Sequence, residues 1–210
     1  MSYLHCTGHH RQVGFVGDSP ESLELHLFTD ADFAGDKADY KSTSGTFLCL
    51  VGPHTFFLLT ASSKKQTVVS HSAVEAEIVA AALGVRESGC PALDLWETVL
   101  GRPVSMTLFE DDQATAKIII SGKAPKLRHT QRMHNVSVSW LTDALDKGIF
   151  TIADCHTKRM AADVLTKPFV SKALWEHAIS LIGIVHDQKL LPKVTASNLR
   201  EESEQARDPP

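Results

Sequence analysis

Residues 23–36 read LELHLFTDADFAGD, and this stretch decides the fold. Leucines alternate with other residues at its start, which predicts a half-buried strand. Asp30 lies on the opposite side of this strand from the leucines, close to its end. Gly35 and Asp36 then mark a turn. The stretch therefore predicts a core strand that carries a carboxylate near its end.

Two further strands are expected directly after it, at residues 43–51 and 56–59, with a continuation of the second through 66–69. Short loops join the three strands, which favours an antiparallel meander. From residue 72 the apolar spacing becomes helical. Ser72 is the expected N-cap with Glu75 as its capping-box partner, and Gly89 is the expected end of the helix.

The second half of the chain alternates between helices and strands. Asp112 is expected to cap a helix that follows the strand before it. The expected elements are a helix at 92–100, a strand at 104–109, helices at 112–120 and 131–145, a strand at 149–153, and helices at 159–167 and 171–183. This order predicts an α/β fold with a five-stranded mixed sheet, in which the meander is followed by parallel strands and helices flank the sheet.

The composition agrees with one globular domain. The chain has 210 residues, of which 43% are hydrophobic and 22% charged, and its net charge is −4. The start of the chain does not have the pattern of a signal peptide. The cysteines are far apart in sequence, which argues against a zinc or disulfide framework and favours a reducing compartment. The negative charge argues weakly against a simple nucleic-acid coat protein.

Four acidic residues stand in distinctive contexts: Asp30, Glu77, Asp111 and Asp163. Asp111 is expected where a strand ends and a helix begins, and ligand sites of open α/β sheets gather there. Carboxylates are the ligands that Mg²⁺ prefers, and a cage of them can hold two cations for phosphodiester cleavage. Taken singly, each acid could equally be a turn residue, a helix cap or part of a solvated helix face. Periodicity does not choose between Glu77 and Glu75.

Four motifs change this balance. They are TDADFAGD at 29–36 with KSTSG at 41–45, SSKKQTV at 62–68 leading to Glu75-Ala76-Glu77, DDQA at 111–114, and ADVLTKP at 162–168. Their order and spacing resemble the ribonuclease H domain of copia-type long-terminal-repeat retrotransposon Gag-Pol polyproteins. The resemblance covers residues 23–170.

The resemblance implies a ribonuclease H-like fold and cleavage of the RNA strand of RNA–DNA hybrids with two Mg²⁺ ions, or with Mn²⁺. It implies that the catalytic metal ligands are Asp30, Glu77, Asp111 and Asp163, where the Ala-Glu-Ile-Val-Ala context favours Glu77. It also implies a reverse transcriptase portion of the same polyprotein as partner, and a location in a cytoplasmic virus-like particle or the nucleus. In this view residues 1–20 are a remnant of the segment linking that portion to the domain, 21–185 are the domain, and 186–210 are a disordered tail.

The chain departs from the family pattern at Ala61, at Ala73-Val74 and at Asp112. These departures keep an alternative open, in which the chain is an inactive remnant that only binds nucleic acid or fills a structural place. A third reading, an integrase-type nuclease, is disfavoured by the acidic positions and the lack of a His/Cys zinc module.

Basic residues suggest where a hybrid would bind. The expected phosphate contacts are Lys64, Lys65, Lys123, Lys126, Arg128 and Arg132. The basic run at 117–134 also contains His129 and His134, and a solvated helix face is the alternative reading for it. His156 precedes Asp163 by seven residues and resembles a histidine that aids product release in many ribonucleases H; the alternative is an exposed loop histidine.

Overall fold

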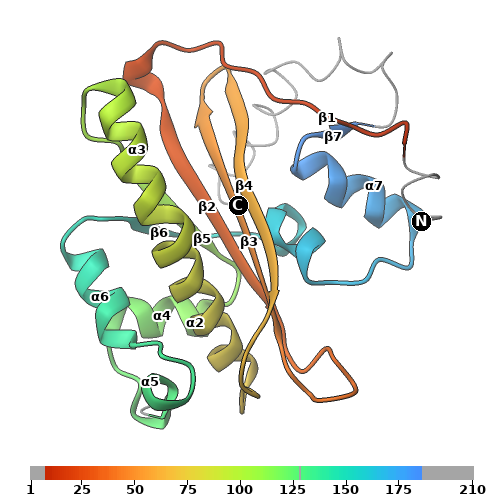
Figure 1. The fold of residues 1–210 in the computed structure, drawn as a ribbon, viewed down its shortest axis with the longest axis vertical. Helices are drawn as coiled ribbons and strands as arrows, with labels where there is room; N and C mark the ends of the chain where they lie inside the picture. Colours follow the sequence, from red (N-terminus) through yellow and green to blue (C-terminus); the bar gives the residue numbers. More distant parts are fainter. Residues whose placement is uncertain (1–7, 128, 186–210) are drawn as a thin grey trace, which may run out of the picture.

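A computed structural model describes residues 8–127 and 129–185 of the chain. Its centre is a five-stranded sheet in the order β4-β3-β2-β5-β6 (Figure 1). The strands are β2 (Glu24–Asp32), β3 (Thr43–Gly52), β4 (Thr55–Lys65), β5 (Met106–Glu110) and β6 (Thr151–Asp154). The first three pair antiparallel, whereas β2–β5 and β5–β6 are parallel. The predicted mixed sheet is therefore confirmed.

The third strand differs from the prediction. It runs without interruption through Lys65, with an irregularity opposite Leu48 and Cys49, and residues 66–69 do not continue it. Gln66 turns inward instead, where its side-chain amide donates to Ser44 Oγ at 2.9 Å and to the Ala76 carbonyl at 3.0 Å. Gln66 therefore ties the end of the meander to the following helix.

One long helical run crosses a face of the sheet (Figure 1). It consists of α2 (Ala73–Leu83), the π-helical segment η2 (Gly84–Gly89) and α3 (Cys90–Leu100). Ser72 caps it as predicted, since its Oγ accepts from the Glu75 N–H at 3.1 Å. The prediction that Gly89 ends the helix is wrong, because Gly89 keeps right-handed helical dihedrals. A Cβ on Gly84 would lie 2.6 Å from Thr29 Cγ2, so glycine there permits close packing of the run on β2.

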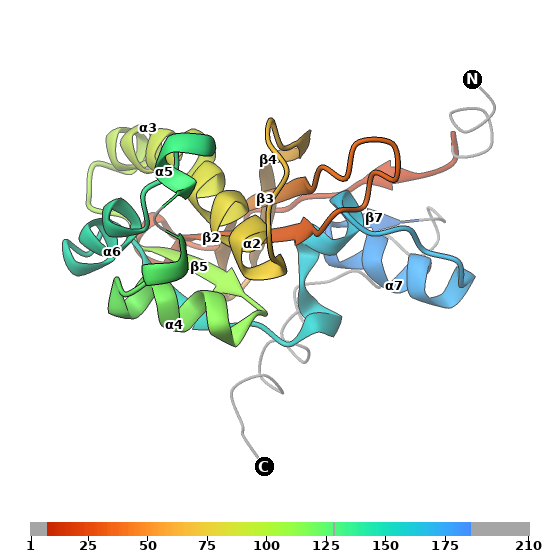
Figure 2. The same ribbon diagram turned by 90° about the horizontal axis from the view of Figure 1, so that it is seen from below.

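The two faces of the sheet bury different side chains. Leu25, Leu27 and Leu48 pack with the helical run in the main core. Phe47 and Cys49, on the other face of β3, pack against Ala161, Ile182 and their neighbours. In Figure 2, α7 (Lys172–Leu181) and β7 (Ile184–Val185) lie on the opposite side of the molecule from α5 and α6.

The helix predicted at 131–145 is instead two helices, α5 (Thr130–Met133) and α6 (Val138–Asp146). Asn135 separates them with a φ of 56°, a left-handed conformation that Asn tolerates better than most residues. Ser137 then caps α6. The helix α4 (Gln113–Ser121) follows the prediction, since the Asp112 carboxylate accepts from the N–H groups of Ala114 and Thr115.

The helix predicted at 159–167 is also different. Two short 3-10 helices, η4 (Thr157–Arg159) and η5 (Ala161–Leu165), occupy this part of the chain, and η1 (Pro20–Ser22) and η3 (Pro125–Leu127) are further 3-10 turns. The 3-10 segments leave Asp163 in a tight turn against the sheet rather than in a long helix.

The N-terminal segment lies against the rest of the molecule. β1 (Arg11–Gln12) pairs antiparallel with β7, and the Phe15 N–H donates to the Phe56 carbonyl at 2.8 Å. The whole of the predicted tail at 186–210, and residues 1–7 of the predicted linker remnant, lie outside the described residues. Among the described helices, none combines the length and apolar character needed to span a membrane.

Candidate metal centre

Three of the predicted acids converge. Asp30 lies in β2, Asp111 directly follows β5, and Asp163 lies in η5. One carboxylate oxygen from each lies within 4.8 Å of the other two. The parallel pairing of β2 with β5 brings the first two together, because neighbouring parallel strands end at the same edge of the sheet. The three carboxylates are close enough to share a cation.

A glycine on the next strand allows Asp163 to reach this edge. Gly45 is the register partner of Asp30 in β3. A Cβ at Gly45 would lie 2.6 Å from Thr166 Cγ2 and 3.0 Å from the Ala162 carbonyl oxygen. The chain around η5 therefore packs directly on the β3 backbone. This close approach places the third carboxylate next to the first.

Hydrogen bonds orient Asp30. Its side chain is almost fully buried and accepts from the Thr166 hydroxyl. The Lys167 ammonium lies 3.1 Å from Asp30 Oδ1 and 2.7 Å from Asp163 Oδ1. Thr166 and Lys167, which directly follow η5, thus hold the carboxylates of Asp30 and Asp163 in place.

Glu77 lies beside the three aspartates but not among them. It is 8% exposed, and its Oε2 has no hydrogen-bond partner among the described residues. Burial raises the pKa of Glu77 to about 10, and the negative charges of Glu110, Asp30 and Asp111 add to this effect. Glu77 is therefore within electrostatic reach of the aspartates, with one oxygen available for a ligand.

Glu75 has a different environment. Its carboxylate is fully buried and accepts from His129 Nε2 at 3.0 Å, from His134 Nε2 at 3.1 Å and from the His71 N–H at 2.9 Å. The two bonds from His129 and His134 join the start of α2 to the segment around α5. The structure thus separates two glutamates that helical periodicity could not distinguish, and it places only Glu77 beside the aspartates.

The electrostatics of the site favour a bound cation. Burial raises the pKa of Asp163 to about 6, although the Lys167 ammonium beside it opposes this shift. Burial likewise raises the pKa of Asp111, opposed by Lys167 and by the Thr157 hydroxyl. Crowded, partly desolvated carboxylates gain stability in their charged form when a cation binds.

Two residues of this centre were not predicted as part of it. Lys167 belongs to the ADVLTKP motif at 162–168, but the spacing of the motif does not predict that its ammonium lies between Asp30 and Asp163. Glu110 is fully buried, and it follows the buried positions Met106 and Leu108 along β5. Burial raises the pKa of Glu110 well above its usual range. The alternation along β5 was the available signal that this glutamate points into the core.

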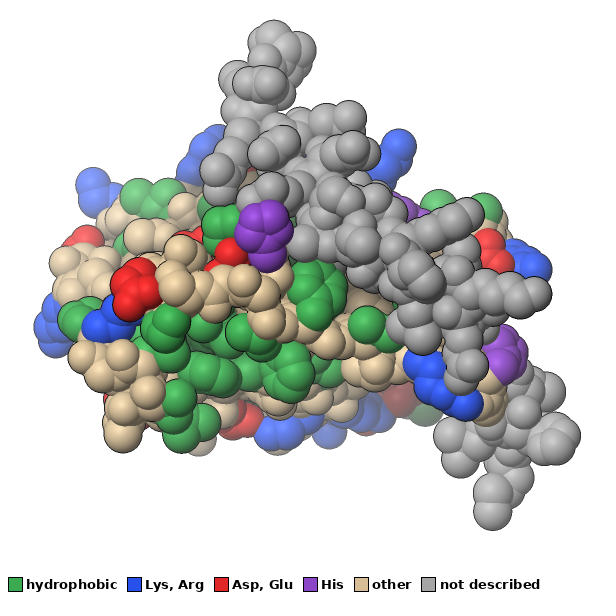
Figure 3. Space-filling model, turned by 90° about the horizontal axis from the view of Figure 1, so that it is seen from above, with side chains coloured by type: hydrophobic (Ala, Val, Ile, Leu, Met, Phe, Trp, Pro, Cys, Tyr) green, Lys and Arg blue, Asp and Glu red, His purple; other side chains and the backbone are tan. Residues whose placement is uncertain are grey.

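The predicted phosphate-binding residues are distributed over the surface. Lys64 pairs with Glu87 at 2.6 Å and Lys65 with Asp39 at 2.9 Å. Lys123, Lys126 and Arg132 are exposed, while Arg128 lies outside the described residues. Figure 3 views the end of the molecule opposite to that in Figure 2, and its Lys and Arg side chains are scattered around the margin of a hydrophobic band.

His129 and His134 do not belong to an exposed basic surface. Both bind the buried Glu75, and His134 is itself buried. His156 is exposed, and its Nδ1 accepts from the Lys158 N–H at 3.1 Å, so it caps η4. Its expected role in product release stays a prediction.

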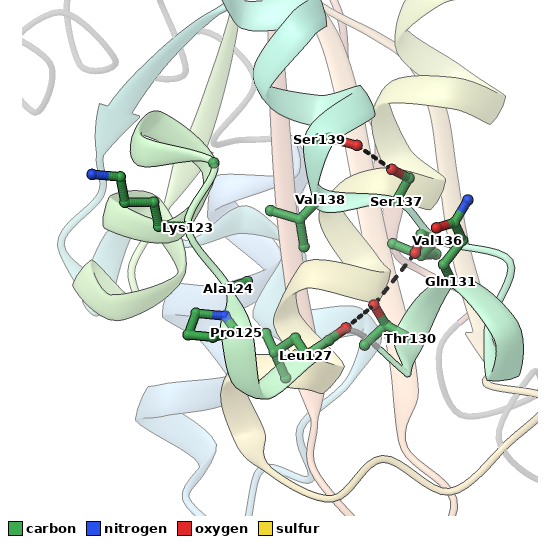
Figure 4. Close-up of a pocket in the computed structure, with 11 residues that line it drawn as sticks. Lys123, Ala124, Pro125, Leu127, Thr130, Gln131, Val136, Ser137, Val138 and Ser139 are labelled. Atoms are coloured by element: carbon green, nitrogen blue, oxygen red, sulfur yellow. Dashed lines mark hydrogen bonds between the residues drawn. The ribbon is translucent and has the colours of Figure 1, made fainter.

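A cleft of about 470 Å³ lies between the α4 end, α5 and α6 (Figure 4). Its lining includes Lys123, Leu127, Thr130 and Val138, and the Thr130 hydroxyl donates to the Leu127 carbonyl at 2.7 Å. None of the four predicted acids lines this cleft. The cleft is therefore separate from the carboxylates.

Sheet order and site together define an α/β domain with a five-stranded mixed sheet and a cluster of acids at the ends of its central strands, as the predicted resemblance requires. Comparison with known proteins gives a more particular relation. The chain is 29% identical over 187 residues to the retrovirus-related Pol polyprotein from transposon RE1 of Arabidopsis thaliana, and 28% identical over 188 residues to that from transposon RE2 of the same plant. Each match covers 88% of this chain and 12% of the relative, so the chain spans about an eighth of these polyproteins.

These relatives confirm the predicted resemblance: the chain is similar to a segment of retrotransposon Pol polyproteins. No family profile matches it. Among solved structures, a ribonuclease H1 isolated from compost by a metagenomic approach is similar, with 14% identity, a TM-score of 0.45, and coverage of 72% of this chain and 98% of that one.

Proposed function

We propose that the chain is a divalent-cation-dependent endonuclease that cleaves the RNA strand of RNA–DNA hybrids during reverse transcription of a retrotransposon. One observation carries the proposal: oxygens of Asp30, Asp111 and Asp163 lie within 4.8 Å of one another. The relation to retrotransposon Pol polyproteins supports the reaction class. The catalytic metal ligands in this proposal are these three residues and Glu77.

The residues present fit a hard cation. All four side chains offer carboxylate oxygens, which Mg²⁺ and Mn²⁺ prefer. The buried Oε2 of Glu77 lacks a partner among the described residues, which is costly unless a ligand satisfies it. Two bound divalent cations would supply activation of a water and stabilisation of the leaving oxygen of the scissile phosphodiester.

The chain's own residues prepare this chemistry. The Thr166 hydroxyl holds Asp30 in one orientation from inside the fold. Asp111 and Asp163 are only partly buried, so this side of the cluster is open to a phosphodiester backbone. Asp30, by contrast, is 1% exposed and forms the rigid floor of the site.

The hybrid would be recognised through its backbone, groove width and 2′-hydroxyls rather than its sequence. Exposed Lys123, Lys126 and Arg132 supply phosphate contacts in this proposal, together with Lys64 and Lys65. The reverse transcriptase portion of the same polyprotein is the proposed partner. The proposed location is a cytoplasmic virus-like particle or the nucleus.

Cleavage of a labelled hybrid tests the proposal. Purified protein with Mg²⁺ should release RNA fragments from an RNA–DNA hybrid but not from single-stranded RNA. Asp30→Asn and Asp111→Asn should each reduce the rate by at least about a hundredfold, because each removes a charged ligand. The matched control is Asp146→Asn, an exposed aspartate of α6, which should cleave as the wild type does. Equal cleavage by all three variants would contradict the assignment.

A second candidate function is an inactive module that binds nucleic acid without cutting it. The Lys167 ammonium among the carboxylates favours it, because this cation already neutralises part of their charge. Melting temperatures separate the two functions. Retained hybrid binding without any stabilisation by Mg²⁺ would favour the inactive module, whereas stabilisation by Mg²⁺ that depends on Asp111 would favour the nuclease.

A further inference from the structure

Lys167 is placed like a bound cation. Its Nζ lies 2.7 Å from Asp163 Oδ1 and 3.1 Å from Asp30 Oδ1, so it joins two of the three clustered aspartates. The Lys167 side chain is 36% exposed. The ammonium is therefore held from one side by carboxylates, while part of the side chain remains in contact with solvent.

Other oxygens near Asp30 make no ion pair with Lys167. Asp111 completes the triad, and Glu77 has a buried Oε2 without a partner among the described residues. The Lys167 ammonium makes ion pairs with Asp30 and Asp163, and it lies more than 4.0 Å from the carboxylate oxygens of Asp111 and Glu77. The site is thus asymmetric: Lys167 bridges Asp30 and Asp163, whereas Asp111 and Glu77 make no ion pair with it.

We propose that the Lys167 ammonium occupies a cation position between Asp30 and Asp163. The chain then binds one divalent cation readily through Asp111 and Glu77. A second divalent cation binds only by displacing the ammonium. The inference rests on the proposed function in that both use the same carboxylates. It adds a means of regulating cation binding at that site, because the second divalent cation must compete with the Lys167 ammonium for the same carboxylates.

Displacement is sterically simple. Lys167 follows η5 and carries its charge on a flexible, partly exposed side chain, so rotation about its side-chain bonds can move the ammonium toward solvent. A divalent cation brings twice the charge of the ammonium to the same oxygens, so it competes effectively at high concentration. The lysine therefore sets a concentration threshold for the second cation rather than a permanent block.

Counting bound Mn²⁺ tests the inference. Electron paramagnetic resonance of free Mn²⁺ gives the number and affinity of bound ions per chain for the wild type and for Lys167→Met, which has a similar length without charge. We expect one tight ion in the wild type and a second that binds at least about tenfold more weakly. In Lys167→Met the second ion should tighten by about tenfold or more.

Two controls accompany the measurement. Lys172→Met removes an equal charge from a lysine that is 85% exposed on α7, and it should bind Mn²⁺ as the wild type does. Lys167→Arg retains the charge and should also behave as the wild type. Without added cation, Lys167→Met should melt at a lower temperature than the wild type, and Mn²⁺ should restore more of its stability. If Lys167→Met does not fold, Lys167→Gln takes its place.

The outcomes are decisive. Equal numbers and affinities of Mn²⁺ in the wild type and the neutral Lys167 variants would overturn the inference. Tightened second-ion binding without any hybrid cleavage would support the inference and contradict the proposed nuclease. Hybrid cleavage by the wild type, with unchanged Mn²⁺ binding in the variants, would support the nuclease and overturn the role of Lys167.

Discussion

At the scale of single residues, two glutamates on one turn of α2 have different environments. Glu75 accepts hydrogen bonds from two histidine rings near α5 and from the His71 N–H just before α2, whereas Glu77 keeps an oxygen that has no partner among the described residues. Sequence context favoured Glu77, but helical spacing could not separate the two. What separates them is which neighbours reach each side chain, and the two histidine rings that bind Glu75, those of His129 and His134, lie more than fifty residues away in the sequence.

Glu77 should make the cation-free protein less stable as pH rises. Its folded-state pKa of about 10 lies above its usual value of 4.5. Below pH 4.5 both states hold the proton, and above it the unfolded state releases a proton that the folded state retains, so stability is lost progressively toward pH 10. Glu77→Gln should therefore show a smaller fall in melting temperature between pH 5 and pH 9 than the wild type, measured with a chelator present.

Glu75→Gln is the matched control for that measurement. It disturbs the acceptor of two histidines in a buried place, so it should destabilise the protein by about 1–3 kcal/mol, and should do so at pH 9 as well. A steeper pH dependence in Glu77→Gln than in the wild type would contradict the assigned environment of Glu77.

Cation affinity should also depend on pH through Asp163. Burial raises the pKa of this carboxyl to about 6, so protons compete with cations below that pH. Calorimetric titration with Mg²⁺ should show affinity rising by up to about tenfold per pH unit from Asp163 below pH 6, and above pH 6 only the deprotonation of Glu77 should add to it. An affinity that is constant from pH 5 to pH 8 would count against Asp163 as a ligand.

At the scale of elements, the strands were predictable and several helix ends were not. Alternation at Leu23, Leu25 and Leu27 identifies β2 because one face of that strand is buried. Gly89 resembles a helix stop, yet tertiary packing carries the helix through it, where a Cβ would meet the Met106 side chain at 2.8 Å. The break at Asn135 depends on one left-handed residue, which composition alone does not reveal.

The approach of η5 to β3 is the element contact on which the centre depends. Gly45→Ala should push the Thr166 and Ala162 region outward, because a Cβ there would lie within 3.0 Å of both. We expect a loss of about 1–3 kcal/mol in unfolding free energy and at least about tenfold weaker Mg²⁺ binding, measured by denaturation and calorimetry. Gly89→Ala is the control, since only the end of a flexible Met106 side chain must move, and its Mg²⁺ affinity should stay unchanged. Equal Mg²⁺ affinity in Gly45→Ala and the wild type would contradict this view of the contact.

At the scale of the whole molecule, the topology turns dispersed acids into one site. Parallel pairing of β2 and β5 aligns Asp30 and Asp111, and η5 returns to the same edge with Asp163. Three of the four acids that the motifs singled out lie together in the structure, and the mixed sheet was predictable from the element order. The internal cation Lys167 and the buried Glu110 were not, because their roles depend on distances between elements.

Binding of a hybrid should depend on salt. The chain has a net charge of −4, so its affinity for phosphates must come from local basic residues. Substituting Lys123 and Lys126 together by Ala should weaken binding equally for hybrids of different sequence and reduce the logarithmic salt slope by about 1.5–2. Fluorescence anisotropy over a range of salt concentrations measures both quantities, with Lys172→Ala as the control. Unchanged affinity and slope would exclude these lysines from the contact surface.

The central claim is that Asp30, Asp111 and Asp163 hold divalent cations. Anomalous diffraction from crystals grown with Mn²⁺ tests it most directly. The account predicts Mn²⁺ with carboxylate oxygens of Asp30 and Asp111 about 2.0–2.3 Å away, and its loss in Asp111→Asn. Crystals at saturating Mn²⁺ that show no anomalous peak at these carboxylates, or a peak that persists unchanged in Asp111→Asn, would contradict it.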